Sequence, residues 1–191
     1  MTRHHRSIGL VLAAFLLANA AHPAGAAPSA VRLADFTRKS SPWQAVNDGV
    51  MGGVSSGTTA ISPRGYLQFA GRVRLENNGG FASARSSRLD ALALAALSAG
   101  TEVVARVRGD GRRYQLTMRT TGPWFWATIE PPAGEWVELR LPYARFAPHG
   151  RFGDLFTGPA YAGEPVESVG VLIYNKRVES FRLDIAWVEV R

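Results

Sequence analysis

Apolar and polar residues alternate along much of the chain, which is typical of β-strands with one buried face. In residues 103–108 every second residue is Val or Ala, and arginines stand between them near the end. Residues 114–119 repeat the alternation after the turn sequence Gly109-Asp110-Gly111. These two segments and the turn are therefore predicted to form a β-hairpin.

The same features predict strands elsewhere, at residues 66–75, 81–86, 124–129, 137–141, 168–174 and 181–185. One helix is expected at residues 89–98, where alanine and leucine dominate and Gly100 could end it. Short strands joined by Gly, Pro and Asx turns, without alternation of strand and helix, predict an all-β antiparallel sandwich or barrel.

A glycine-rich run interrupts the alternation at Asn47-Asp48-Gly49-Val50-Met51-Gly52-Gly53-Val54-Ser55-Ser56-Gly57, here called the glycine loop. Glycine accepts positive φ without steric cost and Asp-Gly favours tight turns, so the backbone should bend sharply there between two strands. Gly52 and Gly53 are expected where a β-carbon would be strained. Asp48, at the first corner, is expected to accept hydrogen bonds from amides of its own loop.

The glycine loop is one of several segments that occur in a definite order. Trp43 precedes the loop, and Asn77-Asn78-Gly79-Gly80-Phe81-Ala82-Ser83 follows it. Then come Gly109-Asp110-Gly111-Arg112 with Tyr114, and Gly170-Val171-Leu172-Ile173-Tyr174-Asn175-Lys176 with Phe181. From Phe36 onward this pattern resembles the complex I intermediate-associated protein 30 family. The resemblance implies a jelly-roll β-sandwich of the galactose-binding-domain type, and chaperone-like or assembly-factor-like binding to another polypeptide.

The first residues predict a secretory signal peptide. Arg3 and Arg6 precede an apolar run at residues 8–18, which is too short to cross a bilayer of about 30 Å, and Ala24-Gly25-Ala26 is an A-x-A cleavage site. We expect cleavage after Ala26, with a site after Ala20 as the alternative. The chain has no cysteine, which excludes disulfides and a lipidated cysteine anchor. Residues 1–26 are thus predicted to be removed, leaving one exported, periplasmic domain over residues 27–191.

Positive charge changes this prediction little. The formal net charge is +7, carried mainly by arginines dispersed along the strands. The nearest approach to a cluster lies between Arg106 and Arg119. No nucleic-acid-binding motif accompanies it, so we interpret these arginines as a solvated strand face and expect no nucleic-acid partner.

The candidate chemistry is sparse. Residues 53–57 match the G-x-S-x-G nucleophile elbow, but β-branched residues follow where that motif needs a helix. His149 is the only histidine after residue 26 and is expected in a surface loop. Without cysteines or paired histidines no transition-metal site is expected, no cofactor is implied, and no carboxylate pair stands out. A structural calcium ion bound by Asp48, Asn77, Asn78 and Asp110 stays open.

Five tryptophans remain to be placed. Trp124 and Trp126 are two residues apart in a predicted strand and share one face. Exposed, they could stack on a sugar or contact a partner protein; buried, they belong to the core, which is what we expect. Trp43, Trp136 and Trp187 are also assigned to the core.

The sequence predicts a non-catalytic, exported protein that binds another polypeptide, with a carbohydrate-binding module as the alternative. Asn78 and Arg112, at the tips of turns, are expected to point outward toward the ligand. The candidate binding residues are Asn47, Asp48, Met51, Gly52, Gly53, Asn77, Asn78, Gly79, Gly80, Asp110, Arg112, Trp124 and Trp126.

Overall fold

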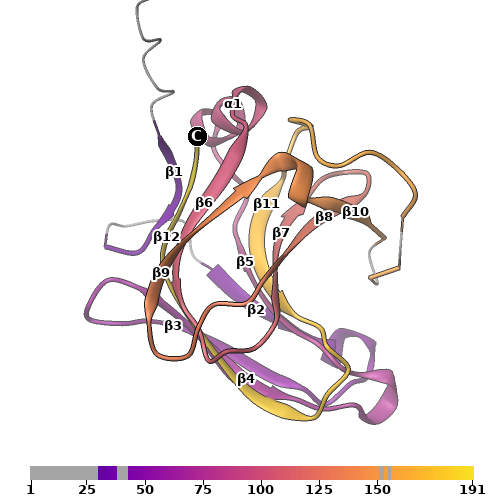
Figure 1. Ribbon diagram of the computed structural model, residues 1–191. Coiled ribbons are helices and arrows are strands. Elements are labelled where there is room, and N and C mark those ends of the chain that lie inside the picture. Colours follow the sequence, from indigo (N-terminus) through magenta and orange to yellow (C-terminus); the bar gives the residue numbers. More distant parts are fainter. Residues whose placement is uncertain (1–29, 38–42, 151–152, 155) are drawn as a thin grey trace, which may run out of the picture.

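Two antiparallel sheets pack face to face in the computed structural model, which describes residues 30–37, 43–150, 153–154 and 156–191 (Figure 1). Sheet A has the order β3 (Ser56–Ile61), β4 (Leu67–Val73), β12 (Glu179–Val190), β6 (Glu102–Arg108) and β9 (Trp136–Pro142), and β1 (Val31–Asp35) also pairs with β12. Sheet B has the order β10 (Ala147–His149), β8 (Trp124–Ile129), β7 (Tyr114–Arg119), β11 (Ser168–Ile173), β5 (Ala82–Ser86) and β2 (Trp43–Asn47). The predicted antiparallel β-sandwich is confirmed.

The glycine and proline turns between strands include three short 3₁₀ helices, η1 (Asp48–Met51), η2 (Glu76–Asn78) and η3 (Tyr143–Arg145). Within the described part of the chain, no helix is long and apolar enough to span a membrane. The predicted signal peptide and its cleavage after Ala26 lie outside the described residues.

The predicted hairpin between residues 103 and 119 is wrong. β6 pairs with β12 and β9 in sheet A, whereas β7 pairs with β8 and β11 in sheet B. The Gly109-Asp110-Gly111 segment therefore carries the chain from one sheet to the other. An alternating pattern indicates which face of a strand is buried, but both sheets of a sandwich bury one face, so the pattern does not identify the partner strand.

The core lies between the sheets and includes the inward residues of both strands, such as Val107 of β6 and Tyr114 of β7. Trp43 belongs to it, as expected. Trp136 and Trp187 do not: they are half-buried on the outer face of sheet A, so their assignment to the core is wrong. Each ring is covered by an arginine. The guanidinium of Arg108 lies 4.8 Å from the ring centroid of Trp136, and that of Arg32 lies 3.9 Å from the ring centroid of Trp187.

The expected helix is confirmed as α1 (Ala91–Ala99), beside β1 at one end of the sandwich (Figure 1). The side chain of Asp90 caps its first turn by accepting a hydrogen bond from the amide of Ala93 at 2.8 Å. The amide of Gly100 donates to the carbonyl of Ala96 and ends the helix. Leu97 and Ala93 bury its inner face in the core.

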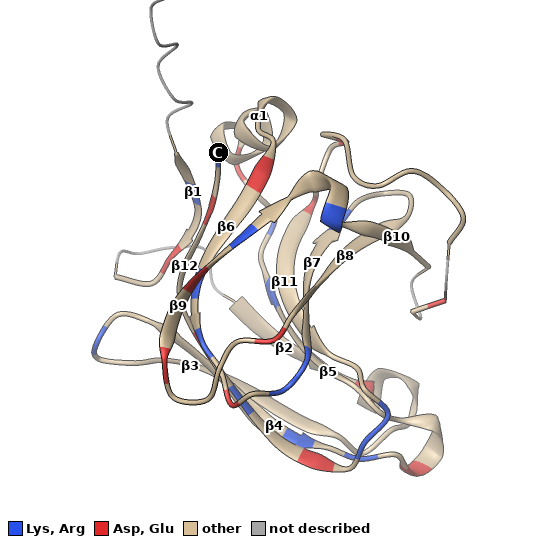
Figure 2. Ribbon diagram, in the orientation of Figure 1, with Lys and Arg blue, Asp and Glu red and all other residues tan. Residues whose placement is uncertain are grey.

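Charge is divided unequally between the two sheets. Figure 2 shows acidic segments on β6, β9 and β12 of sheet A. The strands of sheet B, every residue of which is described, contain no Asp or Glu. The outer face of sheet B is therefore the place where an anion would meet least repulsion from the sheet itself.

Candidate functional site

Asp48 is fully buried and joins two loops at one end of sheet B. Its carboxylate accepts hydrogen bonds from the amide and hydroxyl of Ser55, at 2.9 and 2.5 Å. It also accepts from the amides of Gly80 and Phe81, at 2.7 and 3.3 Å, which belong to the second Asx-Gly segment. The expected bonding to its own loop is confirmed, and the second segment is an additional partner.

The electrostatic state of Asp48 follows from these donors. Burial by itself raises the pKa of the carboxyl, but the hydrogen bonds from Ser55, Gly80 and Phe81 outweigh it and hold the pKa below its ordinary value. Asn77 adds a further link, because its side-chain amide donates to the carbonyl of Gly52 at 3.1 Å. The two loops therefore form one hydrogen-bonded unit built around an anionic carboxylate.

The two expected strained glycines are confined for different reasons. Gly52 has φ of +88°, a conformation that residues with a β-carbon rarely adopt. At Gly53 the restriction is space, because a β-carbon would lie 2.4 Å from Cγ of Asp48. Both glycines allow the loop to close on the Asp48 carboxylate.

Replacing Gly52 with Ala is expected to lower the free energy of unfolding by about 1 kcal/mol, because Ala is strained at positive φ. Gly53→Ala is expected to cost at least as much, since the new methyl group would push against Asp48. Gly49→Ala, in the same turn, is the control: no heavy atom lies within 4 Å of its added β-carbon. Chemical denaturation compares the variants, and equal stabilities would contradict this account.

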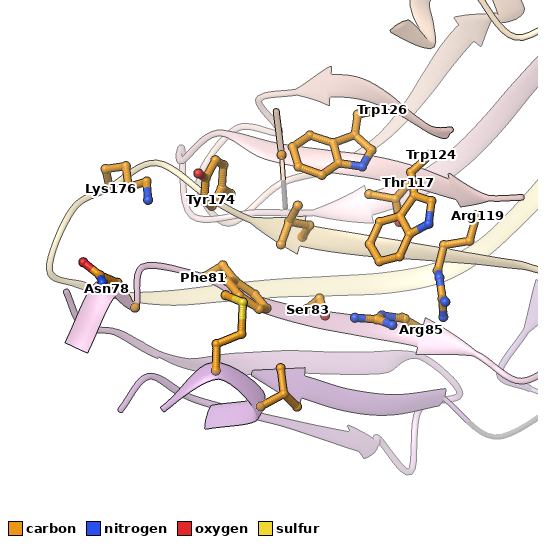
Figure 3. Close-up of a pocket in the computed structure, with 15 residues that line it drawn as sticks. Asn78, Phe81, Ser83, Arg85, Thr117, Arg119, Trp124, Trp126, Tyr174 and Lys176 are labelled. Atoms are coloured by element: carbon orange, nitrogen blue, oxygen red, sulfur yellow. The ribbon is translucent and has the colours of Figure 1, made fainter. Parts of the chain in front are cut away.

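A cleft of about 450 Å³ lies on the outer face of sheet B, and we call it the outer cleft (Figure 3). Its floor and one wall come from strand residues that point away from the core, chiefly Ser83, Arg85, Thr117, Arg119, Trp124 and Trp126. The other edge comes from loops, with Val50, Met51, Asn78, Gly79, Tyr174 and Lys176. The glycine loop and the second Asx-Gly segment, held by Asp48, thus border the cleft.

Aromatic rings form one wall of the outer cleft. Trp126 stacks on His149, with ring centroids 4.3 Å apart and planes 12° apart, and meets Tyr174 edge to face at 6.1 Å. Trp126 is buried, yet it is outside the cluster of residues that forms the core between the sheets. Trp124 is half-buried beside it. The expected burial is therefore confirmed for Trp126, although its ring lies on the outer face of sheet B, and it is wrong for Trp124.

The reason lies in strand β8, which is apolar on both faces. Phe125, Ala127 and Ile129 fill the core, so the two tryptophans point outward. His149 was expected in a surface loop, but it lies in β10, opposite Trp124 in the register with β8.

Several polar groups of this face have no partner within the described structure. The indole nitrogen Nε1 of Trp126, Nε of Arg119 and the hydroxyl of Ser168 are buried without a hydrogen bond. Ser168 lies opposite Arg119 in the register of β11 and β7. Buried polar groups normally have a partner, so these atoms are candidates for bonding a ligand.

The structure separates the predicted binding residues into three groups. Those that line the outer cleft are Met51, Asn78, Gly79, Trp124 and Trp126. Those of the two linked loops that support it are Asn47, Asp48, Gly52, Gly53, Asn77 and Gly80. Asp110 and Arg112 form the third group, away from the cleft.

Arg112 does not point freely outward, so that expectation is wrong. Its guanidinium lies 3.0 Å from a carboxylate oxygen of Asp110 and 3.1 Å from one of Glu179. Asp110 also accepts hydrogen bonds from the hydroxyl of Tyr114 and the amide of Arg182, at 3.0 and 2.8 Å. This network fastens the crossover between the sheets and gives Arg112 a structural role.

Sequence reasoning missed Arg85, Arg119, Thr117, Tyr174 and Lys176 as cleft residues. The alternation within each strand indicated that these residues face away from the core. Arg85 alternates with core residues of β5, and Thr117 and Arg119 alternate with core residues of β7. Alternation alone could not bring strands from distant parts of the chain to the same cleft.

Metal binding finds little support at the residues considered for calcium. The described residues include no group of three His, Asp or Glu side chains that could hold a metal ion. Asp48 and Asp110 already accept several N–H and O–H donors each, and they belong to separate networks. Donors at these oxygens compete with a cation for the same lone pairs.

Comparison with known proteins gives a family and a set of similar folds. The profile of the family described as Complex I intermediate-associated protein 30 (CIA30) matches residues 34–185. No curated protein matches by sequence. A similar solved structure is the family 11 carbohydrate-binding module of the cellulosomal cellulase Lic26A-Cel5E of Clostridium thermocellum. Its TM-score is 0.59 at 12% identity, over 86% of this chain and 95% of that chain.

Two other structures extend the comparison. The family 11 module from Clostridium thermocellum in complex with a β-1,3-1,4-mixed-linked tetrasaccharide has a TM-score of 0.56 at 12% identity, over 83% of this chain and 94% of that one. An exo-β-agarase has a TM-score of 0.54 at 10% identity, over 84% of this chain but 24% of that one. At these identities the likeness establishes the fold, a jelly-roll sandwich of the galactose-binding-domain type, as expected.

Proposed function

We propose that this chain, which belongs to the complex I intermediate-associated protein 30 family, is a non-catalytic binding domain that holds a carbohydrate in the outer cleft. The observation that carries the proposal is the wall formed by Trp124, Trp126 and Tyr174 on the outer face of sheet B. The sequence by itself favours a polypeptide ligand over a carbohydrate. The outward position of the tryptophans reverses that order.

The geometry of the cleft suits a sugar chain. Trp126 is buried, but Trp124 is half-buried and leaves part of its indole ring exposed in the cleft, where the C–H face of a pyranose can pack on it. Unpartnered donors such as Nε1 of Trp126 can bond hydroxyl oxygens, and binding then removes the cost of leaving them unpaired. The volume of about 450 Å³ lies within the range of ligand pockets, roughly 300 to 1,000 Å³. The structural neighbour with a bound tetrasaccharide is further support, since it shares the fold.

Export and a periplasmic location, with a signal peptide over residues 1–26, are part of the proposal. An exported domain would meet glycans directly, which fits a carbohydrate ligand better than an intracellular role. N-terminal sequencing of the fractionated protein tests this part separately.

Polypeptide binding is the second candidate function. Val50, Met51 and Val54 of the glycine loop are 73%, 47% and 44% exposed, which is unusual for apolar side chains on one loop. The family description also refers to a protein complex. A partner chain could cover these residues at the edge of the outer cleft.

Replacing Trp124 with Ala is expected to weaken polysaccharide binding by about 2 kcal/mol, or roughly 30-fold in Kd, because a stacking surface is lost. Affinity gels containing mixed-linked β-glucan, agarose, polygalacturonate or a sulfated galactan identify which polysaccharide retains the protein. Calorimetry with oligosaccharides of that polysaccharide then measures Kd. Trp187→Ala is the matched control: Trp187 is also half-buried and covered by an arginine, but on sheet A. It should lose similar stability and keep full binding.

Two outcomes would overturn the carbohydrate proposal. In the first, none of these polysaccharides retains the wild-type protein. In the second, Trp124→Ala and Trp187→Ala lose binding equally. Crosslinking in the native cell then tests the second candidate. Loss of crosslinked proteins in a variant carrying Val50→Ser and Met51→Ser would support a polypeptide partner.

A further inference from the structure

Arg85 and Arg119 are the only Arg, Lys, Asp or Glu residues in the strands of sheet B. Both side chains line the outer cleft and lie near the ring of Trp124 (Figure 3). Among the described residues that line the cleft none is acidic, and Lys176 adds a third cation. The outer cleft therefore carries positive charge without a compensating carboxylate on its walls.

The guanidinium groups of Arg85 and Arg119 both lie close to the indole ring of Trp124. That of Arg119 lies 4.6 Å from the ring centroid of Trp124, and that of Arg85 lies 5.3 Å from it. Gly170 belongs to β11, between β5 and β7. It lies opposite Arg85 of β5 on one side and opposite Thr117 of β7 on the other. With no side chain at Gly170, the floor stays open between β5 and β7, and Arg85 can reach across it.

These arginines differ from those of sheet A, where buried carboxylates are matched by arginines. Asp184 has Arg108 and Arg182 at 2.6 and 3.2 Å, and Glu189 has Arg32 at 2.9 Å. Within the described structure, Arg85 and Arg119 have neither an ion pair nor a side-chain hydrogen bond, and Nε of Arg119 is buried. Both arginines are half-buried, so each guanidinium has lost part of its hydration without gaining an acceptor, and an anion could supply that acceptor.

The charge of Arg85 responds to this environment. Burial first, and the nearby charge of Arg119 second, lower the pKa of Arg85 to about 10. Burial and the charge of Arg119 both destabilise the protonated guanidinium of Arg85, and a bound anion would stabilise it. The guanidinium still carries its proton at neutral pH, so it is available to an anion.

Resting on the proposed carbohydrate function, we propose that the ligand is an acidic saccharide whose carboxylate or sulfate group binds between Arg85 and Arg119. Its ring packs on Trp124, beside Trp126. Guanidinium groups bind both anions through paired N–H donors, and Arg is suited to this task by its planar geometry. Lys176, whose ammonium lies 4.8 Å from the ring of Tyr174 toward the other end of the cleft, is placed to meet a second acidic unit of the same chain.

Calorimetry on the wild-type protein with matched ligands tests this proposal. Trigalacturonate is compared with its methyl ester, and a sulfated galactan oligosaccharide with its desulfated form. We expect at least one acidic ligand to bind about tenfold or more tightly than its neutral counterpart, and to weaken as salt is raised. Whichever acidic member is preferred identifies the anion as carboxylate or sulfate.

Arg119→Gln and Arg85→Gln should each weaken binding of the acidic ligand far more than binding of its neutral counterpart, and so remove most of that preference. Arg72→Gln is the control for net charge, since Arg72 is exposed on sheet A. Thermal melts confirm that each variant is folded.

Equal affinity for acidic and neutral saccharides, unaffected by either Arg→Gln change, would overturn the acidic ligand and leave the carbohydrate function standing. Absence of binding to every saccharide would remove both. Poly-L-glutamate or sodium sulfate binding as tightly as the acidic saccharides would overturn this inference in favour of an acidic peptide or a simple anion site.

Discussion

Replacing Asp48 with Asn is expected to lower the free energy of unfolding by about 3 kcal/mol or more, since hydrogen bonds to a buried charged group contribute about 1.5 to 3 kcal/mol each. The carboxylate accepts four hydrogen bonds from Ser55, Gly80 and Phe81. The amide of Asn has one oxygen to accept them, and its NH₂ group would face N–H donors. Urea denaturation at neutral pH measures the loss.

The pH dependence gives a second readout of the same group. The pKa of Asp48 is lowered from its ordinary value of 3.8 in the folded protein. A lowered folded pKa means that the stabilisation is complete above the pKa of the unfolded chain and is lost as pH falls through the folded pKa. The contribution of Asp48 should therefore stay constant at pH values well above 3.8, and as pH falls below 3.8 the wild-type protein should lose stability that Asp48→Asn has already lost.

Asp90→Asn is the matched control for this change. Asp90 caps α1 at the surface, and Asn is about as good a helix cap as Asp, so the variant should stay close to the wild type. If Asp48→Asn were as stable as Asp90→Asn, the carboxylate would not be what holds the two loops together.

Gly71→Ala is expected to cost about 3 kcal/mol or more, and to lower Tm by roughly 10 °C. Gly71 lies on β4 opposite Gly57, the last residue of the glycine loop. A β-carbon there would lie 1.9 Å from the carbonyl oxygen of Ser56 and 2.8 Å from Cα of Gly57. Both are backbone atoms, so β3 would have to move away from β4 to make room.

Displacement of β3 should also reach the outer cleft, because Ser55 precedes β3 and donates to Asp48. Gly122→Ala serves as the control, since the nearest atom to its added β-carbon is 3.7 Å away. Thermal melts compare the two variants. A melting temperature for Gly71→Ala within 2 °C of that of Gly122→Ala would show that the β3–β4 contact adapts without cost.

Local features of this protein follow from its sequence. The positions of β6, β7 and β8, and of α1 between Asp90 and Gly100, were predictable because period and capping depend on neighbouring residues. The sharp bend of the glycine loop was predictable for the same reason, since positive φ at Gly52 is a property of one residue. The order of the Asx-Gly segments was enough to suggest the family.

The tertiary structure decided which strands meet and which faces look outward. β6 and β7 alternate like a hairpin, yet they lie in different sheets, because the pattern specifies a buried face and not a partner. Both faces of β8 are apolar, so only packing shows that Phe125 enters the core and Trp124 the outer cleft. The proposed ligand surface depends on Arg85 and Arg119, which the strand order of sheet B brings to one tryptophan. Pairing over such sequence distances is set by the whole fold.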